Sequence, residues 1–149
     1  MSNRTDITNL LVNNLKLINA GISPFNPDYT FNTNIHGNAM KGTKFIDEIN
    51  DFPSVFVISE TEYRKYNTTD LTEAVVETVV RCYIMDDNTL VTMNGLIQDI
   101  EHVVYSITSP TELLLQDITI SNIITDKGLL HPYGMAEIFL NARFEIFTN

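Results

Sequence analysis

The sequence has a single cysteine and few basic residues, and each scarcity excludes a class of protein. Cys82 has no second cysteine to pair with, which excludes a disulfide-stapled secreted domain and suits a reducing compartment. Nine Lys and Arg residues stand against nineteen Asp and Glu residues, for a net charge of -10. No basic stripe is present that would contact the phosphates of duplex DNA. The composition therefore argues against a protein that reads nucleic acid.

Long hydrophobic runs are also absent. A membrane-spanning helix needs about eighteen or more consecutive apolar residues, and no such run occurs. Residues 1–6 do not form a basic segment followed by an apolar stretch, so we expect neither export nor contact with a membrane. The chain has 149 residues, 44% of them hydrophobic and 19% charged, which predicts one packed domain over residues 1–149.

Motifs that carry catalysis or bind metals are missing as well. The three histidines have no metal-ligand spacing with one another or with the cysteine: His36, His102 and His131. Asp86-Asp87 lacks the alternating oxygen ligands and fixed glycine of a calcium loop, and a place at a helix start explains the pair better. No glycine-rich phosphate cradle or nucleophile elbow occurs. We therefore expect no catalytic residue, no metal and no cofactor, and hence no enzyme.

The first half of the chain predicts few regular elements. Apolar residues at spacings of three and four predict a helix over residues 6–20, capped by Thr5 or Asp6 and stopped by Gly21. A short strand is expected near residues 29–33 and another over residues 52–58. Polar and Pro- or Asn-rich stretches predict two long surface loops, at about residues 22–43 and 59–72. Such loops are candidates for contacts with partners.

Residues 73–147 carry the clearest pattern. Alternation predicts strands over residues 73–85, 113–125 and 135–147, the last two joined by a turn at residues 126–128. Between the first two strands, an apolar stripe predicts a helix over residues 89–107, with Asn88 or the preceding aspartates as its cap. Gln98, Asp99 and Glu101 fall outside that stripe, and His102 is expected at its rim or on the surface.

This order predicts an α+β fold, a two-layer sandwich in which two helices cover one face of a mainly antiparallel sheet, in the order α-β-β-β-α-β-β. The opposite face would be too apolar to remain exposed, so we expect an oligomer. Residues 131–134 (His-Pro-Tyr-Gly) fit either a widened turn or an aromatic exposed for a contact. The candidate interface residues are Val75, Val79, Tyr83, Tyr133, Phe139 and Arg143.

The element order resembles that of the tail terminator proteins of tailed bacteriophages. The similarity covers nearly the whole chain and includes the run AVVETVVRCYIMDD at residues 74–87, the helix that follows and the two closing strands. The resemblance implies a structural virion protein, made in the cytoplasm of the bacterial host. It implies a ring, usually a hexamer, that caps the tail tube, ends its growth and joins the tail to the neck, while DNA passes through the hole.

Two other hypotheses remain open from the sequence. Another neck or head-completion protein of a virion would have a similar size and would also form a ring. A small α+β ligand-binding domain or enzyme would instead require a concave pocket with converging polar groups.

Overall fold

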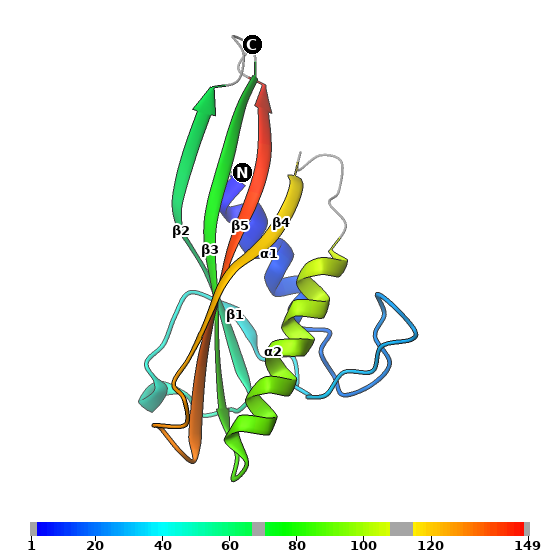
Figure 1. The fold of residues 1–149 in the computed structure, drawn as a ribbon, viewed down its shortest axis with the longest axis vertical. Coiled ribbons are helices and arrows are strands. Elements are labelled where there is room, and N and C mark those ends of the chain that lie inside the picture. Colours follow the sequence, from blue (N-terminus) through cyan, green and yellow to red (C-terminus); the bar gives the residue numbers. More distant parts are fainter. Residues whose placement is uncertain (1–2, 67–70, 108–114, 148–149) are drawn as a thin grey trace.

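The computed structural model describes residues 3–66, 71–107 and 115–147. Its elements are α1 (Asn3–Leu15), β1 (Ala39–Lys41), a 3-10 turn η1 (Ile46–Glu48), β2 (Ser54–Tyr66), β3 (Leu71–Met85), α2 (Thr89–Ser106), β4 (Leu115–Thr125) and β5 (Tyr133–Phe147). The structure confirms the α+β class and the sequence of a helix, strands, a second helix and two closing strands (Figure 1).

The five strands form one sheet in the order β1-β2-β3-β5-β4. All neighbours are antiparallel except β1, which runs parallel to β2 along Val55, Phe56 and Val57 only. β3 lies in the centre and pairs with β5 over its full length, from Leu71 opposite Phe147 to Met85 opposite Tyr133. The sheet is long and strongly twisted, and its two ends lie far from each other (Figure 1).

Both helices pack against the same face of the sheet. Alternate residues of β3 and β5 are buried there because successive side chains of a strand point to opposite faces. A single hydrophobic core joins them to the apolar stripes of the two helices, which include Ile7, Leu11 and Leu15 of α1 and Leu96, Ile100 and Val103 of α2. Each such side chain contributes about 1.5–3 kcal/mol when fully buried. Cys82 is part of this core, as expected, and burial raises the pKa of its thiol to about 12.

The first helix and the first strand differ from the prediction. α1 begins at Asn3 and ends at Leu15, so neither Thr5 nor Asp6 caps it and Gly21 does not end it. Residues 29–33 do not form a strand but lie in a loop that makes an isolated bridge between Ile22 and Thr30. The additional strand is β1, at residues 39–41. Residues 29–33 stay out of the sheet because Asp99 of α2 accepts hydrogen bonds from the backbone amides of Asn32 and Thr33.

The predicted surface loop after residue 58 is also wrong for its described part. β2 continues to Tyr66 and pairs with β3 from Ser54 opposite Tyr83 to Tyr66 opposite Thr72. A polar stretch forms a strand here because one side of its backbone bonds to β3 while most of its side chains stay exposed to solvent. In the rest of the predicted loop, residues 67–70 lie outside the described residues, and residues 71 and 72 belong to β3.

The C-terminal block follows the prediction closely. α2 spans Thr89–Ser106, and Asn88 takes the N-cap position, although its side chain makes no capping hydrogen bond. Its backbone amide instead donates to Asp86 Oδ1, at an N–O distance of 2.7 Å. β4 is described from Leu115, and β5 starts two residues earlier than expected, at Tyr133.

Candidate assembly surfaces

The sheet face that carries no helix is more polar than the sequence suggested. Arg143 donates to both carboxylate oxygens of Asp117, with its Nε 2.9 Å from Oδ1, and its Nη1 lies 3.7 Å from Glu73 Oε1. Hydrogen bonds from this guanidinium hold the pKa of Asp117 below its usual value. Lower on the same face, Arg81 Nη2 lies 2.8 Å from Glu137 Oε2. These charged pairs share the face with the half-buried Val75 and Phe139, so the face is less apolar than expected, and the oligomer stays a prediction.

Two of the predicted interface residues are buried within the single chain. Tyr83 is 3% exposed, because its hydroxyl donates to the Lys44 carbonyl at 2.9 Å and its ring packs edge-on against Phe56. Val79 is 1% exposed and lies between Ile58 and Phe139 in the sheet register. Neither side chain is available for a partner in this conformation, which corrects the prediction for both.

The other four predicted interface residues are at least partly accessible. Val75 and Phe139 are half-buried on the helix-free face, and Arg143 lies beside them with a half-exposed side chain. Tyr133 is exposed at the far end of the sheet. The structure therefore does not bring the six residues together into one surface.

β3 ends and α2 begins at one end of the molecule (Figure 1), and the residues at this end include a group of exposed apolar side chains. We call it the apolar tip and define it as Met85, Leu90, Leu129, Leu130 and Tyr133. The β4–β5 turn lies beside the start of α2, since His131 Nε2 is 3.0 Å from the Asp87 carbonyl. Leu129 is 86% exposed, and exposed apolar side chains gathered at one end of a molecule are candidates for an interaction site. The signal in the sequence was the pair Leu129-Leu130, two large apolar residues inside a turn.

An unexpected polar site lies on α2. Asp99 was predicted to face solvent, yet it is fully buried and accepts five hydrogen bonds from residues 29–33. Tyr29 Oη (2.8 Å), the Asn32 amide nitrogen (2.9 Å) and Asn32 Nδ2 (3.2 Å) donate to its Oδ1. The Thr33 amide nitrogen (2.8 Å) and Thr33 Oγ1 (2.6 Å) donate to its Oδ2. Gly95, one turn earlier, allows this approach, because an added Cβ would lie 3.1 Å from Asn32 Cβ.

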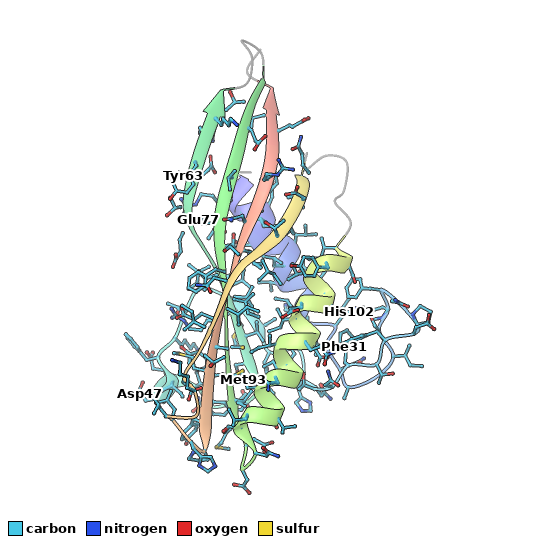
Figure 2. All side chains as sticks on the ribbon, viewed as in Figure 1. Phe31, Asp47, Tyr63, Glu77, Met93 and His102 are labelled. Carbon is cyan, nitrogen blue, oxygen red and sulfur yellow. The ribbon has the colours of Figure 1, made fainter. Side chains whose placement is uncertain are left out.

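Aromatic residues extend the same contact. His102 was expected at the rim of the helix, and it stacks on Tyr29 with ring centroids 3.9 Å apart and an interplanar angle of 9°. Its Nε2 lies 2.7 Å from Ser23 Oγ, and burial lowers its pKa. Figure 2 shows His102 and Phe31 together where the loop meets α2, and their ring centroids are 5.8 Å apart. The chain between α1 and β1, residues 16–38, is thus an arm fixed to α2; we refer to it as the arm.

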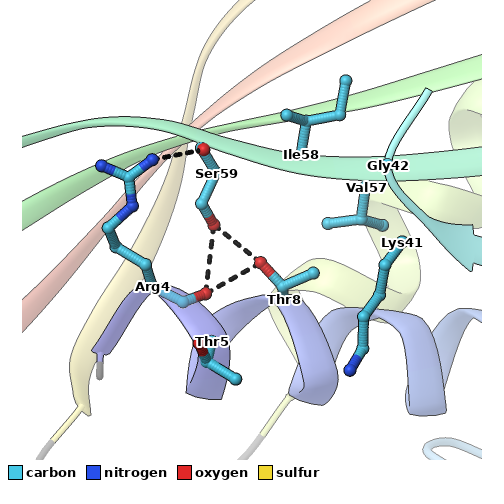
Figure 3. Close-up of a pocket in the computed structure, with 8 residues that line it drawn as sticks. All are labelled: Arg4, Thr5, Thr8, Lys41, Gly42, Val57, Ile58 and Ser59. Carbon is cyan, nitrogen blue, oxygen red and sulfur yellow. Dashed lines mark hydrogen bonds between the residues drawn. The ribbon is translucent and has the colours of Figure 1, made fainter. Parts of the chain in front are cut away.

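A shallow hollow of about 260 Å³ lies between α1 and the edge of β2 (Figure 3). Arg4 Nη2 donates to the carbonyls of Ser59 (2.8 Å) and Glu60 (2.9 Å), and Lys41 lies on the opposite wall. The hydroxyls of Thr8 and Ser59 are 2.7 Å apart. Arg4 therefore satisfies two carbonyls of β2 where β1 has ended.

Among residues 3–66, 71–107 and 115–147, no group of three or more His, Cys, Asp or Glu side chains is placed to hold a metal ion. Within the same residues, no helix is both long and apolar enough to cross a membrane. The surfaces described above are suited to binding other chains.

Comparison with known proteins agrees with that geometry. The family model described as "Bacteriophage Tail Tube Terminator Protein" matches residues 1–148. The chain belongs to this family. Tail tube terminator protein p142 of Escherichia phage T5 is 29% identical over 157 residues, which cover 97% of this chain and 95% of that protein. The resemblance read from the element order is confirmed, and a tail terminator is a structural protein of the phage.

Proposed function

We propose that this tail terminator forms a ring, a hexamer of identical copies, that caps the phage tail tube. The ring ends growth of the tube and joins the tail to the neck. The observation that carries this proposal is the family match over residues 1–148. It is supported by a relative of nearly the same length that is named a tail tube terminator. The same match favours the tail tube over the other neck or head-completion positions that the sequence left open.

The two ends of the sheet differ in a way that suits two partners. One end is the apolar tip, and the other carries the charged residues Lys65, Glu73 and Glu145, which are neighbours in the register. In a ring whose strands run roughly along its axis, these ends form its two rims. We assign the apolar tip to the tail tube, because durable contacts bury apolar surface, and the charged end to the neck. Tyr133, in the tip, keeps its proposed contact role.

The helix-free face suits the hole of the ring. It carries more carboxylates than cations: the acids include Glu60, Glu73, Glu77, Asp117, Glu137 and Glu145, and the cations include Lys65, Arg81 and Arg143. A net negative, hydrated wall repels the phosphates of DNA, so the genome would pass without specific binding. In this arrangement Val75, Phe139 and Arg143 border the hole. The arm lies on the helix side and stays a proposed contact to a neighbouring ring.

Purified protein and tail tube protein allow a direct test of capping. Tube protein alone is expected to form polymers of uncontrolled length, and adding the terminator should stop growth at one end and place a ring there in electron micrographs. Tubes of unchanged length with bare ends would refute the proposal. Rings that bind the neck proteins and ignore the tube would instead favour the alternative neck position.

Two variants test the role of the apolar tip. Leu129→Ser should reduce capping, because it removes an apolar side chain from the proposed contact with the tube. The fold should lose little stability, since Leu129 is 86% exposed. Phe45→Ser is the matched control, since Phe45 is 78% exposed and lies outside both the tip and the arm. Equal capping by both variants would remove the tip from the tube contact. Tight, salt-sensitive binding of DNA by the isolated protein would contradict the repulsive hole.

A further inference from the structure

Both outer edges of the sheet have a stretch of backbone without a partner strand among the described residues. β4 is the last strand on one side. On the other side, β1 covers β2 only along Val55, Phe56 and Val57. Arg4 occupies the next carbonyls, those of Ser59 and Glu60, and this leaves residues 61–66 of β2 open. Open edges present unpaired N–H and C=O groups, and these readily pair with another strand.

The two open stretches lie at the same level of the sheet. The register runs from Thr61 through Glu77 and Asn141 to Thr119, and one step higher from Tyr63 through Val75 and Arg143 to Asp117. Residues 61–66 of β2 and 115–120 of β4 therefore flank the same half of the molecule. Each is about 20 Å long at the usual rise of a strand. A rotation about an axis along the strands would bring one beside the other without a shift along that axis.

The direction of the strands also fits. β2, β3, β5 and β4 alternate in direction across the sheet, so β4 runs opposite to β2. A rotation about the ring axis preserves directions, and the β4 of one copy would therefore meet the β2 of the next copy as an antiparallel pair. The alternation would then continue unbroken from copy to copy.

Charge separates the two edges. The open stretch of β2 carries Arg64 and Lys65 against Glu62, and the open stretch of β4 carries Asp117 without a Lys or Arg. The two stretches therefore have net charges of opposite sign. A head-to-tail ring contact joins two different surfaces, and opposite charge favours that contact over pairing of two like edges.

We propose that β4 of one copy pairs with residues 61–66 of β2 in the next copy, so that the sheets join into one continuous antiparallel sheet around the ring. This inference rests on the proposed ring and identifies the contact that closes it. The partner is a second copy of this chain. Main-chain hydrogen bonds supply the contact, and the alternation of strand direction makes the pair antiparallel.

Cysteine pairs test the contact and its register. Thr61 and Thr119 are exposed on the helix-free face at the same level, so a chain carrying both Thr61→Cys and Thr119→Cys should form disulfides between copies. Mild oxidation is expected to give a ladder of covalent oligomers that ends at the ring number and collapses to monomer with reductant. Replacing Thr61→Cys by Tyr63→Cys covers a shift of two residues, and replacing Thr119→Cys by Asp117→Cys covers a shift in the other direction.

Single-cysteine variants are the controls. Thr61→Cys alone and Thr119→Cys alone should remain monomeric on denaturing gels, because the proposed contact never places two copies of one position together. Cys82 is fully buried and stays out of the reaction. Disulfide dimers from a single variant would show two-fold pairing of like edges and overturn the inference.

Light scattering and particle images of the same samples distinguish failure of the edge pairing from failure of the ring itself. Rings without a ladder in any of the double variants would overturn the edge pairing and leave the ring in place. Wild-type protein that forms no ring, alone or on the tail tube, would refute the proposed function together with this inference. A ladder that ends at the ring number supports both.

Discussion

Replacing Asp99 tests whether a buried carboxylate fixes the arm to α2. Asp99→Ala removes the acceptor for five hydrogen bonds, two of them from the backbone amides of Asn32 and Thr33. Asp99→Asn keeps the shape of the side chain and one acceptor oxygen, and it replaces the other oxygen with a donor that faces the donors of Thr33. The two variants thus separate loss of volume from loss of acceptors.

The magnitude follows from the groups that are left without a partner. A buried donor that loses its acceptor costs about 1–3 kcal/mol, and the two backbone amides cannot leave the site without moving the arm. We therefore expect Asp99→Ala to lower the free energy of unfolding by about 3–5 kcal/mol, and Asp99→Asn by about 2–4 kcal/mol. Either loss is a large part of the roughly 5–15 kcal/mol that stabilises a typical domain.

Two measurements locate the loss. Denaturant unfolding gives its size, and hydrogen exchange shows where the structure opens. The Asn32 and Thr33 amides should lose protection first, since the arm can detach before β3 and β5 unfold. If the arm detaches without unfolding of the sheet, the free energy of global unfolding falls less. The hydrogen-exchange rates of the arm amides then rise instead.

Glu101→Ala is the control, because it removes a carboxylate from the same helix that has no hydrogen bond among the described residues. Its free energy of unfolding should stay within about 0.5 kcal/mol of wild type. The reasoning is refuted if Asp99→Ala changes the free energy of unfolding by less than about 1 kcal/mol and leaves the Asn32 and Thr33 amides protected.

Three further predictions concern packing and pH. Gly134→Ala should lower the free energy of unfolding by about 1–3 kcal/mol, because the new Cβ would lie 2.9 Å from Ile84 Cγ1; unchanged thermal unfolding would contradict this. The lowered pKa of His102 means that the unfolded chain binds its proton more readily, so stability should fall as the pH drops from about 6.5, and His102→Phe should flatten that part of the pH profile. The Asp117 pKa is held low by Arg143, which stabilises the fold above pH about 4 and is lost below it; the difference in free energy of unfolding between wild type and Arg143→Gln should therefore shrink in acid.

Much of the fold could be predicted because its signals are local. The segments of β3 and α2 each have an uninterrupted apolar period. Such a period places the apolar side chains on one face only when the segment forms a strand or a helix, respectively. The same holds for β4 and β5. Membership of the tail terminator family could be recognised from the order of these elements, without any catalytic or metal-binding motif.

Several errors concern residues whose state depends on distant parts of the chain. Residues 59–66 are polar, and they form a strand because β3 offers its backbone groups. Asp99 lies off the apolar stripe and is nevertheless buried, because donors 66–70 positions away in the sequence approach it. Tyr83 alternates onto the helix-free face, and the segment after β1 covers it.

The sequence by itself determined the class of fold and the shortage of basic residues, because these follow from composition and from local apolar periods. The order of the elements carried the resemblance to the tail terminator family. Only the tertiary structure decided which surfaces are available for assembly. In the tertiary structure Val79 and Tyr83 are buried and the residues of the apolar tip are exposed. Among the described residues, the outer edges of β2 and β4 lack a partner strand at the same level of the sheet. The physical reason is that burial and edge pairing depend on contacts between segments far apart in the chain, and such contacts leave no local pattern.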